Sequence, residues 1–348
     1  MIWNPFKSSA DTCLGIDVGS FSVKLIEVKD KGKQKELSNY GEVKLKEIYP
    51  NQEKDIAAIN AEEIGSIIDA VIKEAGIKSR RAVLSLPDYH TFFTTFTLPS
   101  MTKEEIVEAV KFEAPVRIPL PASKVSLDWQ VVEGGTGKKD EAIRILLVAI
   151  PTEVLSKYQE IVSAAKLDLL TFEAEAFSLI RTLIKDEKTT VLADIGAEST
   201  TCSIVDKKII RASHSFDTGG KKLTFAVSKA LNVDIEEVER MKKEKGILGE
   251  QKIKDSLLPV IDLIVEEIRR ASENFFDEES RKVEKIILTG GSALLPGLKE
   301  YMESNLAIPA EIGNPFSVIY YPEELTGKIK KMSPLYATAL GAGLRGLK

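Results

Sequence analysis

The sequence predicts an α/β protein made of two related domains, and three observations support this prediction. Apolar and β-branched residues flank a small-residue turn at residues 14–28, as in two strands joined by a tight hairpin. The central pattern of that run, Asp-apolar-Gly-x-x-Ser, recurs 177 residues later at residues 194–199. Amphipathic helical patterns alternate with short apolar strands elsewhere in the 348 residues, a length sufficient for two hydrophobic cores.

The first hairpin contains the residue types that a triphosphate and its metal require. Gly15 and Gly19 allow a sharp turn and the close approach of an anion, while Ser20 and Ser22 add hydroxyl donors. Asp17 ends the first strand, where its carboxylate can hold a hydrated Mg²⁺. Taken by itself, this turn is better explained as an ordinary hairpin.

The second copy of the pattern favours the phosphate interpretation. In both copies a second apolar strand and a charged turn follow the small residues. The corresponding positions are Asp17 with Asp194, Gly19 with Gly196, and Ser22 with Ser199. A repeat at half-chain spacing suggests two related domains that face each other across one ligand.

The remaining elements can be placed in chain order. Asn60 and Glu63 form a predicted capping box for a helix that ends at Gly76, and residues 82–87 predict a buried strand. We therefore predict that residues 1–87 begin the first domain. Residues 88–168 predict a β-α-β-β-α subdomain inserted into it, in which a helix ends near Pro115, an extended proline-fixed link covers residues 116–121 and a flexible loop covers residues 134–140.

The second half contains two further glycine turns. Residues 169–188 are expected to return to the first domain and form a connecting helix that starts within residues 172–180, and residues 189–332 to form the second domain. Gly219 and Gly220 precede a helix and can present amide N–H groups to a phosphate. Residues 283–291 predict a buried strand that ends in Thr-Gly-Gly, at the edge where ligands bind in open α/β sheets. Residues 333–348 predict a C-terminal connecting helix.

Composition excludes several classes of protein. The net charge of −5 argues against a dedicated nucleic-acid binder. The two cysteines cannot form a disulfide framework, and the two histidines have no metal-ligand spacing. Neither a Walker A sequence nor GxGxxG is present, and no apolar run approaches the ~20 residues of a membrane-spanning helix.

The motifs, in this order, resemble those of the actin-like ATPase superfamily. The resemblance implies an actin-like fold, in which two RNase H-like domains flank a nucleotide cleft. It rests on five segments: Asp17–Lys24 and Asp194–Thr201 resemble the two phosphate motifs, Thr289–Pro296 the adenosine motif, and Phe172–Leu179 and Pro334–Ala342 the two connecting helices.

Within that superfamily the sequence resembles the PilM family of type IV pilus assembly most, and FtsA next. One feature of this resemblance is a short Phe-Lys segment immediately before the first motif. The inserted subdomain follows the opening sheet of the first domain, as in FtsA and PilM and not as in actin. Glu113–Pro121 with Asp128 resembles the Glu-…-Ile-Pro segment of the family. The family also has a Gly-Gly-x-x-Leu-Thr run followed by Glu-x-x-Lys, and residues 219–224 with Glu239 and Lys242 resemble it. The resemblance implies that Glu239 and Lys242 reach the ribose and the base. A long C-terminal helix of the FtsA kind is not seen, which favours PilM.

The resemblance implies ATP and Mg²⁺ in the cleft between the domains. Asp17 and Asp194 are expected to hold the metal through water, and Lys24 to neutralise phosphate charge. The other implied nucleotide contacts are Gly19, Ser20, Ser22, Gly196, Ser199, Thr200, Gly219, Gly220, Glu239, Lys242, Gly290, Gly291 and Ser292. Glu173 and Glu175 are candidates to orient an attacking water, and solvated surface charges explain them equally well. Whether ATP is hydrolysed stays open.

The resemblance also implies a cytoplasmic scaffold, peripheral at the inner membrane. Its expected partner is the cytosolic N-terminal peptide of a PilN-like membrane protein, bound in a groove between the first subdomain and the inserted one. Other pilus assembly components are implied partners, and self-association into a ring or filament stays open. Two alternatives remain: an FtsA-like polymerising division protein, and a small-molecule kinase of the same superfamily, for which no catalytic aspartate is identifiable.

Overall fold

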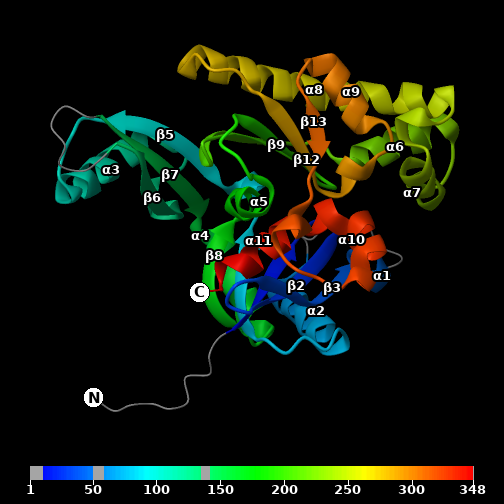
Figure 1. The fold of residues 1–348 in the computed structure, drawn as a ribbon, viewed down its shortest axis with the longest axis horizontal. Helices are drawn as coiled ribbons and strands as arrows, with labels where there is room; N and C mark the ends of the chain where they lie inside the picture. The colour runs from blue at the N-terminus through cyan, green and yellow to red at the C-terminus, as the bar shows by residue number, and fades with distance from the viewer. Residues whose placement is uncertain (1–10, 50–58, 135–141, 348) are drawn as a thin grey trace. The chain divides into compact units, whose positions relative to one another are not determined.

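The computed structural model describes residues 11–49, 59–134 and 142–347 (Figure 1). The chain divides into two compact units. The first unit comprises Met1–Pro87, Tyr158–Leu183 and Gly313–Lys348, and the second comprises Asp88–Lys157 and Ile184–Ile312. Each unit is described separately below. The domain boundaries expected from the sequence remain a prediction.

The first unit is built on a five-stranded sheet in the order β3-β2-β1-β4-β8. Strands β1 to β3 are antiparallel neighbours, whereas β4 lies parallel to β1 and β8 lies parallel to β4. The strands are β1 (Thr12–Val18), β2 (Ser22–Asp30), β3 (Lys35–Lys44), β4 (Arg81–Leu86) and β8 (Asp168–Ala174). The helices are α1 (Leu45–Ile48), α2 (Ala61–Glu74), α5 (Glu175–Leu183), α10 (Thr326–Met332) and α11 (Ala337–Arg345).

The second unit repeats this arrangement in a sheet of order β11-β10-β9-β12-β13. Here too the first three strands are antiparallel and the last two join in parallel. The strands are β9 (Thr190–Ile195), β10 (Thr200–Asp206), β11 (Ile209–Phe216), β12 (Lys285–Thr289) and β13 (Ala310–Ile312). The helices are α6 (Gly220–Leu231), α7 (Ile235–Glu244), α8 (Gln251–Glu279) and α9 (Leu298–Leu306). Two sheets of the same design confirm the α/β prediction of related domains.

Helix α8 is the main support of the second core. Its 29 residues place Leu257, Ile261, Ile264 and Ile268 in the buried cluster beneath the sheet, at the helical spacing of an amphipathic face. Charged residues occupy much of the rest of the helix. Across residues 11–49, 59–134 and 142–347, no helix is both long enough and apolar enough to cross a membrane.

The inserted segment forms a small layer of its own. Its three-stranded sheet has the order β5-β7-β6 and packs against one helix. These elements are β5 (Phe92–Leu98), α3 (Lys103–Arg117), β6 (Val125–Glu133) and β7 (Ile143–Pro151), followed by α4 (Thr152–Ala164). Residues 88–157 pack within the second compact unit, although they interrupt the chain of the first.

Partly buried ion pairs join the inserted layer to the second sheet. Arg211 of β11 contacts Glu133 of β6, and its Nη2 also donates to Asp206 Oδ2 at 2.9 Å. Arg144 of β7 lies 3.5 Å from Glu133 and pairs with Glu279 at the end of α8. Since Arg211 and Asp206 are almost fully buried, their charges need compensation, which they give each other together with Glu133 and Arg281.

Two local expectations were wrong. Helix α3 continues through Pro115 to Arg117, because Ile118 N–H still donates to the Ala114 carbonyl at 3.0 Å. The connecting helix begins only at Glu175, because Phe172–Ala174 pair with β4 as the last residues of β8. Six residues of the predicted loop, 135–140, lie outside the described residues.

Glycines allow helices of the first unit to lie directly on backbone. A Cβ at Gly15 of β1 would lie 1.9 Å from the Ala339 carbonyl oxygen and 2.2 Å from Gly343 N in α11. A Cβ at Gly341 would lie 2.2 Å from the Ser178 carbonyl oxygen in α5. The glycines therefore bring α11 against both β1 and α5.

We predict that Gly15→Ala destabilises the protein by about 2–3 kcal/mol, because α11 must move away from β1. Urea unfolding monitored by circular dichroism measures this change. The matched control is Gly327→Ala in α10, where no atom lies within 4 Å of the new methyl group and stability should stay the same or rise by about 0.5–1 kcal/mol. Equal effects of the two substitutions would contradict the packing described.

Candidate functional site

The first hairpin turns tightly between β1 and β2. Gly19 N–H donates to the Ser22 carbonyl at 3.1 Å, which closes the turn. Asp17 and Lys24 are opposite each other in the antiparallel register. Lys24 Nζ lies 3.1 Å from Asp17 Oδ2, and both side chains are largely buried. The turn therefore presents a buried carboxylate together with its own cation.

The hydroxyl of Ser22 has no hydrogen-bond partner within the described residues. Its residue is 1% exposed, and its Oγ is fully shielded from solvent. A buried hydroxyl without a partner carries a free-energy cost of about 1–3 kcal/mol. A hydroxyl in this position, beside a glycine turn and a carboxylate, is the kind of group that a bound ligand would complete.

The second hairpin repeats the geometry of the first. Gly196 N–H donates to the Ser199 carbonyl at 3.0 Å, the equivalent of the bond at Gly19. Asp194 lies opposite Thr201 in the register of β9 and β10. The sequence repeat therefore corresponds to a repeated turn, with a threonine in the second copy at the position of Lys24.

Gly219 and Gly220 bring the start of α6 onto the second hairpin. Gly220 N–H donates to the Gly196 carbonyl at 2.9 Å, and Lys221 N–H donates to the Ala197 carbonyl at 2.9 Å. A Cβ at Gly219 would lie 2.7 Å from the same Ala197 oxygen. The N–H groups of Gly220 and Lys221, in the first turn of α6, are used in these contacts with the hairpin. The start of α6 therefore holds the second hairpin in place.

The end of β12 completes the second half-site. Thr289 is opposite Asp194 in the parallel register, and Gly290 follows with φ +81°. A Cβ at Gly290 would lie 2.4 Å from Asp194 Oδ1, whereas one at Gly291 would meet no atom within 4 Å. Ser292 Oγ lies 2.8 Å from the Cβ position of Gly220. Three glycine segments distant in sequence thus converge around Asp194.

Lys242 and Glu239 of α7 meet the first turn of α6. The ammonium of Lys242 donates to the Gly220 carbonyl at 2.9 Å, to Thr224 Oγ1 at 2.6 Å and to Glu239 Oε1 at 2.8 Å. Thr224 Oγ1 also contacts Glu239 Oε1. These contacts tie α7 to the start of α6 and fix one oxygen of Glu239.

Burial and charge act in opposite directions in this cluster. Burial lowers the pKa of the Lys242 ammonium below its ordinary value, although the Glu239 carboxylate opposes the shift. Burial would raise the pKa of Glu239, but the charge and hydrogen bond of Lys242 outweigh it and hold the pKa below its ordinary value. Glu239 is therefore an ionised acceptor at neutral pH.

The two candidate water-orienting glutamates have different surroundings. Glu173 accepts two hydrogen bonds from Arg181, at 2.6 and 2.7 Å, and one from Ser178 Oγ at 2.8 Å. Glu175 begins α5. Burial, and then the carboxylates of Glu175 and Asp17, raise the pKa of the Tyr158 phenol. Glu173 therefore forms an ion pair with Arg181 of α5, whose guanidinium also donates to the Gly341 carbonyl of α11. The carboxylates of Glu175 and Asp17 both favour the neutral form of the buried Tyr158 phenol.

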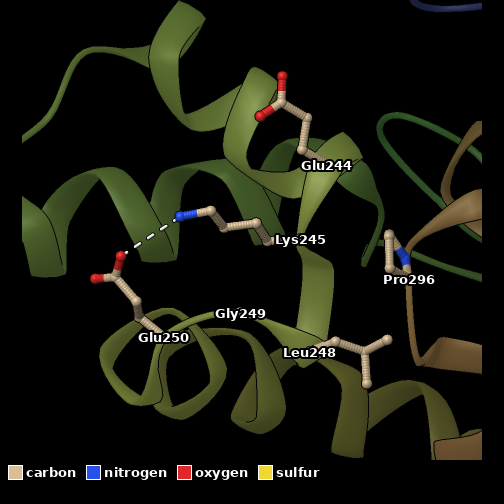
Figure 2. Close-up of a pocket in the computed structure, with 6 residues that line it drawn as sticks. All are labelled: Glu244, Lys245, Leu248, Gly249, Glu250 and Pro296. Carbon is tan, nitrogen blue, oxygen red and sulfur yellow. Dashed lines mark hydrogen bonds and ion pairs between the residues drawn. The ribbon is translucent and has the colours of Figure 1, made fainter.

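A shallow pocket lies outside both hairpins. Figure 2 shows Lys245 and Glu250 pointing toward each other across it, with a Nζ–Oε1 distance of 3.4 Å, and Leu248 and Pro296 at its other side. Ile247 N–H donates to the Pro296 carbonyl at 2.9 Å. Pro296, the last residue of the segment predicted to resemble the adenosine motif, lines the pocket, and the pocket wall supports the segment that follows Ser292.

Each hairpin, taken by itself, has donors of the kind that hydrated magnesium and phosphate oxygens accept. Each hairpin supplies a carboxylate beside a glycine turn, and the orphaned Ser22 hydroxyl adds a donor. Residues 11–49, 59–134 and 142–347 contain no cluster of three or more metal-ligating side chains. Mg²⁺ does not need such a cluster, because it keeps several waters and takes one or two carboxylates with substrate phosphates.

Comparison with known protein families shows which family this chain belongs to. Residues 15–347 match the family described as type IV pilus assembly protein PilM. The chain belongs to this family. The match includes both hairpins and the β12 turn, so the structure agrees with the resemblance inferred from the motifs.

Curated relatives and solved structures support the fold. The cell division protein FtsA of Enterococcus faecalis is 24% identical over 90% of this chain and 83% of its own length. A solved PilM-PilN type IV pilus biogenesis complex superposes with a TM-score of 0.84 at 24% identity, covering 98% of this chain and 99% of the other. MreB5 of Spiroplasma citri bound to ADP superposes with a TM-score of 0.53 at 12% identity, covering 97% and 96%. At these identities the superpositions establish the actin-like fold.

The structure adds one residue that the predicted site lacked. Thr224 joins Gly220, Lys242 and Glu239, although only its place in the Gly-Gly-x-x-Leu-Thr run marked it in the sequence. The predicted residues of each hairpin lie together, and those of the second half-site converge on one sheet edge. Their roles in nucleotide binding remain predictions.

We predict that Thr224→Val destabilises the second unit by about 1–3 kcal/mol, because Lys242 loses an acceptor while remaining buried. Urea unfolding measures the loss. The control is Thr97→Val on the exposed side of β5, which should leave stability nearly unchanged. A Thr224 variant as stable as the control would contradict the bridging role of the hydroxyl.

Proposed function

We propose that this protein is an ATP-binding scaffold of a type IV pilus inner-membrane assembly complex. The observation that carries the proposal is membership of the PilM family over residues 15–347. A nucleotide role is supported by two hairpins with the same turn, each with an aspartate at the same position.

Both half-sites contribute to Mg·ATP binding in this proposal. The first supplies the turn at Gly19, the Ser20 and Ser22 hydroxyls and the charges of Asp17 and Lys24. The second supplies a larger set, composed of Asp194, Gly196, Ser199, Thr200, Gly219, Gly220, Glu239, Lys242, Gly290, Gly291 and Ser292. When bound, Mg²⁺ would neutralise charge on the phosphates, and the aspartates would hold it through water.

Glu173 and Glu175 are the candidates for orienting a water molecule, and the contacts of Glu173 are the better defined. The Glu173 carboxylate already accepts hydrogen bonds from Arg181 and Ser178, so moving it would break an ion pair of α5. We propose that Glu173 positions α5 through Arg181. A scaffold requires only slow turnover, because bound ATP can stabilise one state of the protein.

The proposed partner is the cytosolic N-terminal peptide of a PilN-like membrane protein. The support is the similarity to a solved complex whose two components are PilM and PilN. Binding to such a peptide would hold the protein at the cytoplasmic face of the inner membrane. Other pilus components would then assemble on it.

A second candidate function is FtsA-like polymerisation. The supporting observation is the 24% identity to FtsA of Enterococcus faecalis over 90% of this chain. Electron microscopy on lipid monolayers with ATP distinguishes the two candidates, because filaments support polymerisation and dispersed particles support the scaffold.

We predict that Asp17→Ala and Asp194→Ala each weaken Mg·ATP binding by about 10-fold or more, since each removes an outer-sphere carboxylate or the ion pair that shapes its turn. Isothermal titration calorimetry measures the affinities. Asp277→Ala, at an exposed position of α8, is the matched control and should bind as the parent does. Full affinity in both hairpin variants would show that the site lies elsewhere.

We predict that an immobilised N-terminal PilN-like peptide captures the purified protein and that a scrambled peptide of the same composition does not. Surface plasmon resonance with and without Mg·ATP measures the binding. A change in affinity on adding nucleotide would indicate coupling between the two ligands. Absence of binding under both conditions would contradict the partner assignment.

A further inference from the structure

Charged side chains form a closed ring between the inserted layer and the second sheet. Positive and negative groups alternate around it, and no two neighbours are more than 3.7 Å apart. The inserted layer supplies two members, from β6 and β7. The elements around the second sheet supply the others, from β10, β11, the end of α8 and the segment after it. In ring order the members are Glu133, Arg211, Asp206, Arg281, Glu279 and Arg144, which returns to Glu133.

Two of the ring contacts cross from one layer to the other. Glu133, at the end of β6, accepts a hydrogen bond from Arg211 of β11. Arg144 of β7 donates to Glu279 at the end of α8. The hydrophobic cores of the inserted layer and of the second sheet are separate clusters, although β5 lies beside β11. The ring therefore joins two layers that each have a core of their own.

Separation of the layers at these two contacts would leave no member of the ring without a counter-charge. Glu133 and Arg144 keep each other, since Arg144 Nε lies 3.5 Å from Glu133 Oε2. On the second sheet, Asp206 Oδ2 keeps its contacts with Arg211 at 2.9 Å and with Arg281 at 2.7 Å. Each half of the ring has as many positive as negative members. Opening therefore avoids the large penalty of an isolated buried charge.

The closed ring leaves one of its cations incompletely bonded. The Arg211 side chain is 2% exposed, and its Nε and Nη1 have no hydrogen-bond partner within the described residues. Water would reach these donors if Glu133 moved away. Because a buried donor without a partner raises the free energy of the closed form, hydration of Arg211 offsets part of the loss of the crossing contacts.

We infer that this ring is a clasp that opens reversibly, so that the inserted layer can separate from the second sheet while both layers stay folded. The side chains of Glu133 and Arg281 are 37% and 34% exposed, so salt screens the outer part of the ring and favours opening. Asp206 ends β10, the strand that begins at Thr200 in the second hairpin. The open clasp thus frees the inserted layer from the strands that carry this hairpin.

The experiment places one spin label on each layer, at Lys111→Cys in α3 and Asn274→Cys in α8, both exposed positions. Double electron–electron resonance measures the distance between the labels. The native Cys13 and Cys202 are buried and stay unlabelled. At about 0.1 M NaCl the short distance of the closed clasp should dominate, and a longer distance should gain population at about 1 M NaCl.

The ring variants remove the crossing contacts without stranding a charge. Glu133→Gln and Glu279→Gln each delete one crossing contact, and each should raise the ratio of open to closed protein about 10-fold. Glu133→Lys places a cation beside the two arginines that Glu133 contacts, so the longer distance should dominate. The control combines Glu104→Gln with Glu278→Gln, exposed glutamates of the same two labelled helices, and should keep the distances of the parent.

A distance distribution in Glu133→Lys that matches the parent and the control would overturn the inference. Circular dichroism separates opening from unfolding, because the open variants should keep the spectrum of the parent. Loss of secondary structure in step with loss of the short distance would also overturn it, since the ring would then belong to one cooperative core. The labelled protein is measured without nucleotide, so the result does not depend on the proposed ATP binding.

Discussion

The hydrogen bond that closes each hairpin is the constraint on which the candidate site depends. It joins a glycine N–H to the carbonyl of the serine three residues later, in both copies. This short turn fixes the antiparallel register, and the register places each aspartate at the end of its first strand. A longer turn would move the carboxylate along the strand, and a one-residue slip would turn it to the other face of the sheet.

Close backbone packing supports each turn from a different element. In the first unit, α11 lies on β1 because Gly15 has no side chain to hold it away. In the second unit, Gly219 and Gly290 allow the start of α6 and the end of β12 to approach the Gly196 turn and Asp194. Hydrogen bonds among buried Lys242, buried Thr224 and half-buried Glu239 then hold α7 against α6. A buried polar group that loses its hydrogen-bond partner raises the free energy of the folded protein, so these contacts favour one arrangement of the loops.

The two hairpins could be predicted from the sequence because alternating apolar residues and small-residue turns are local patterns. Their recurrence at residues 194–199 strengthened the prediction. The motif order was also sufficient for the family. Contacts between distant residues left no such signal. Neither the pairing of Glu133 with Arg211 nor the engagement of Glu173 by Arg181 follows from spacing. The three hydrogen bonds of Lys242 to Gly220, Thr224 and Glu239 could not be predicted from the sequence either. Nor could the continuation of α3 past Pro115.

The proposed function assigns both hairpins to the binding of a single nucleotide. Their similarity alone would also allow two independent phosphate sites. Calorimetry of the parent protein with Mg·ATP separates these cases through the stoichiometry. We expect a single nucleotide to bind per chain, whereas two nucleotides per chain, or none, would contradict the proposed function.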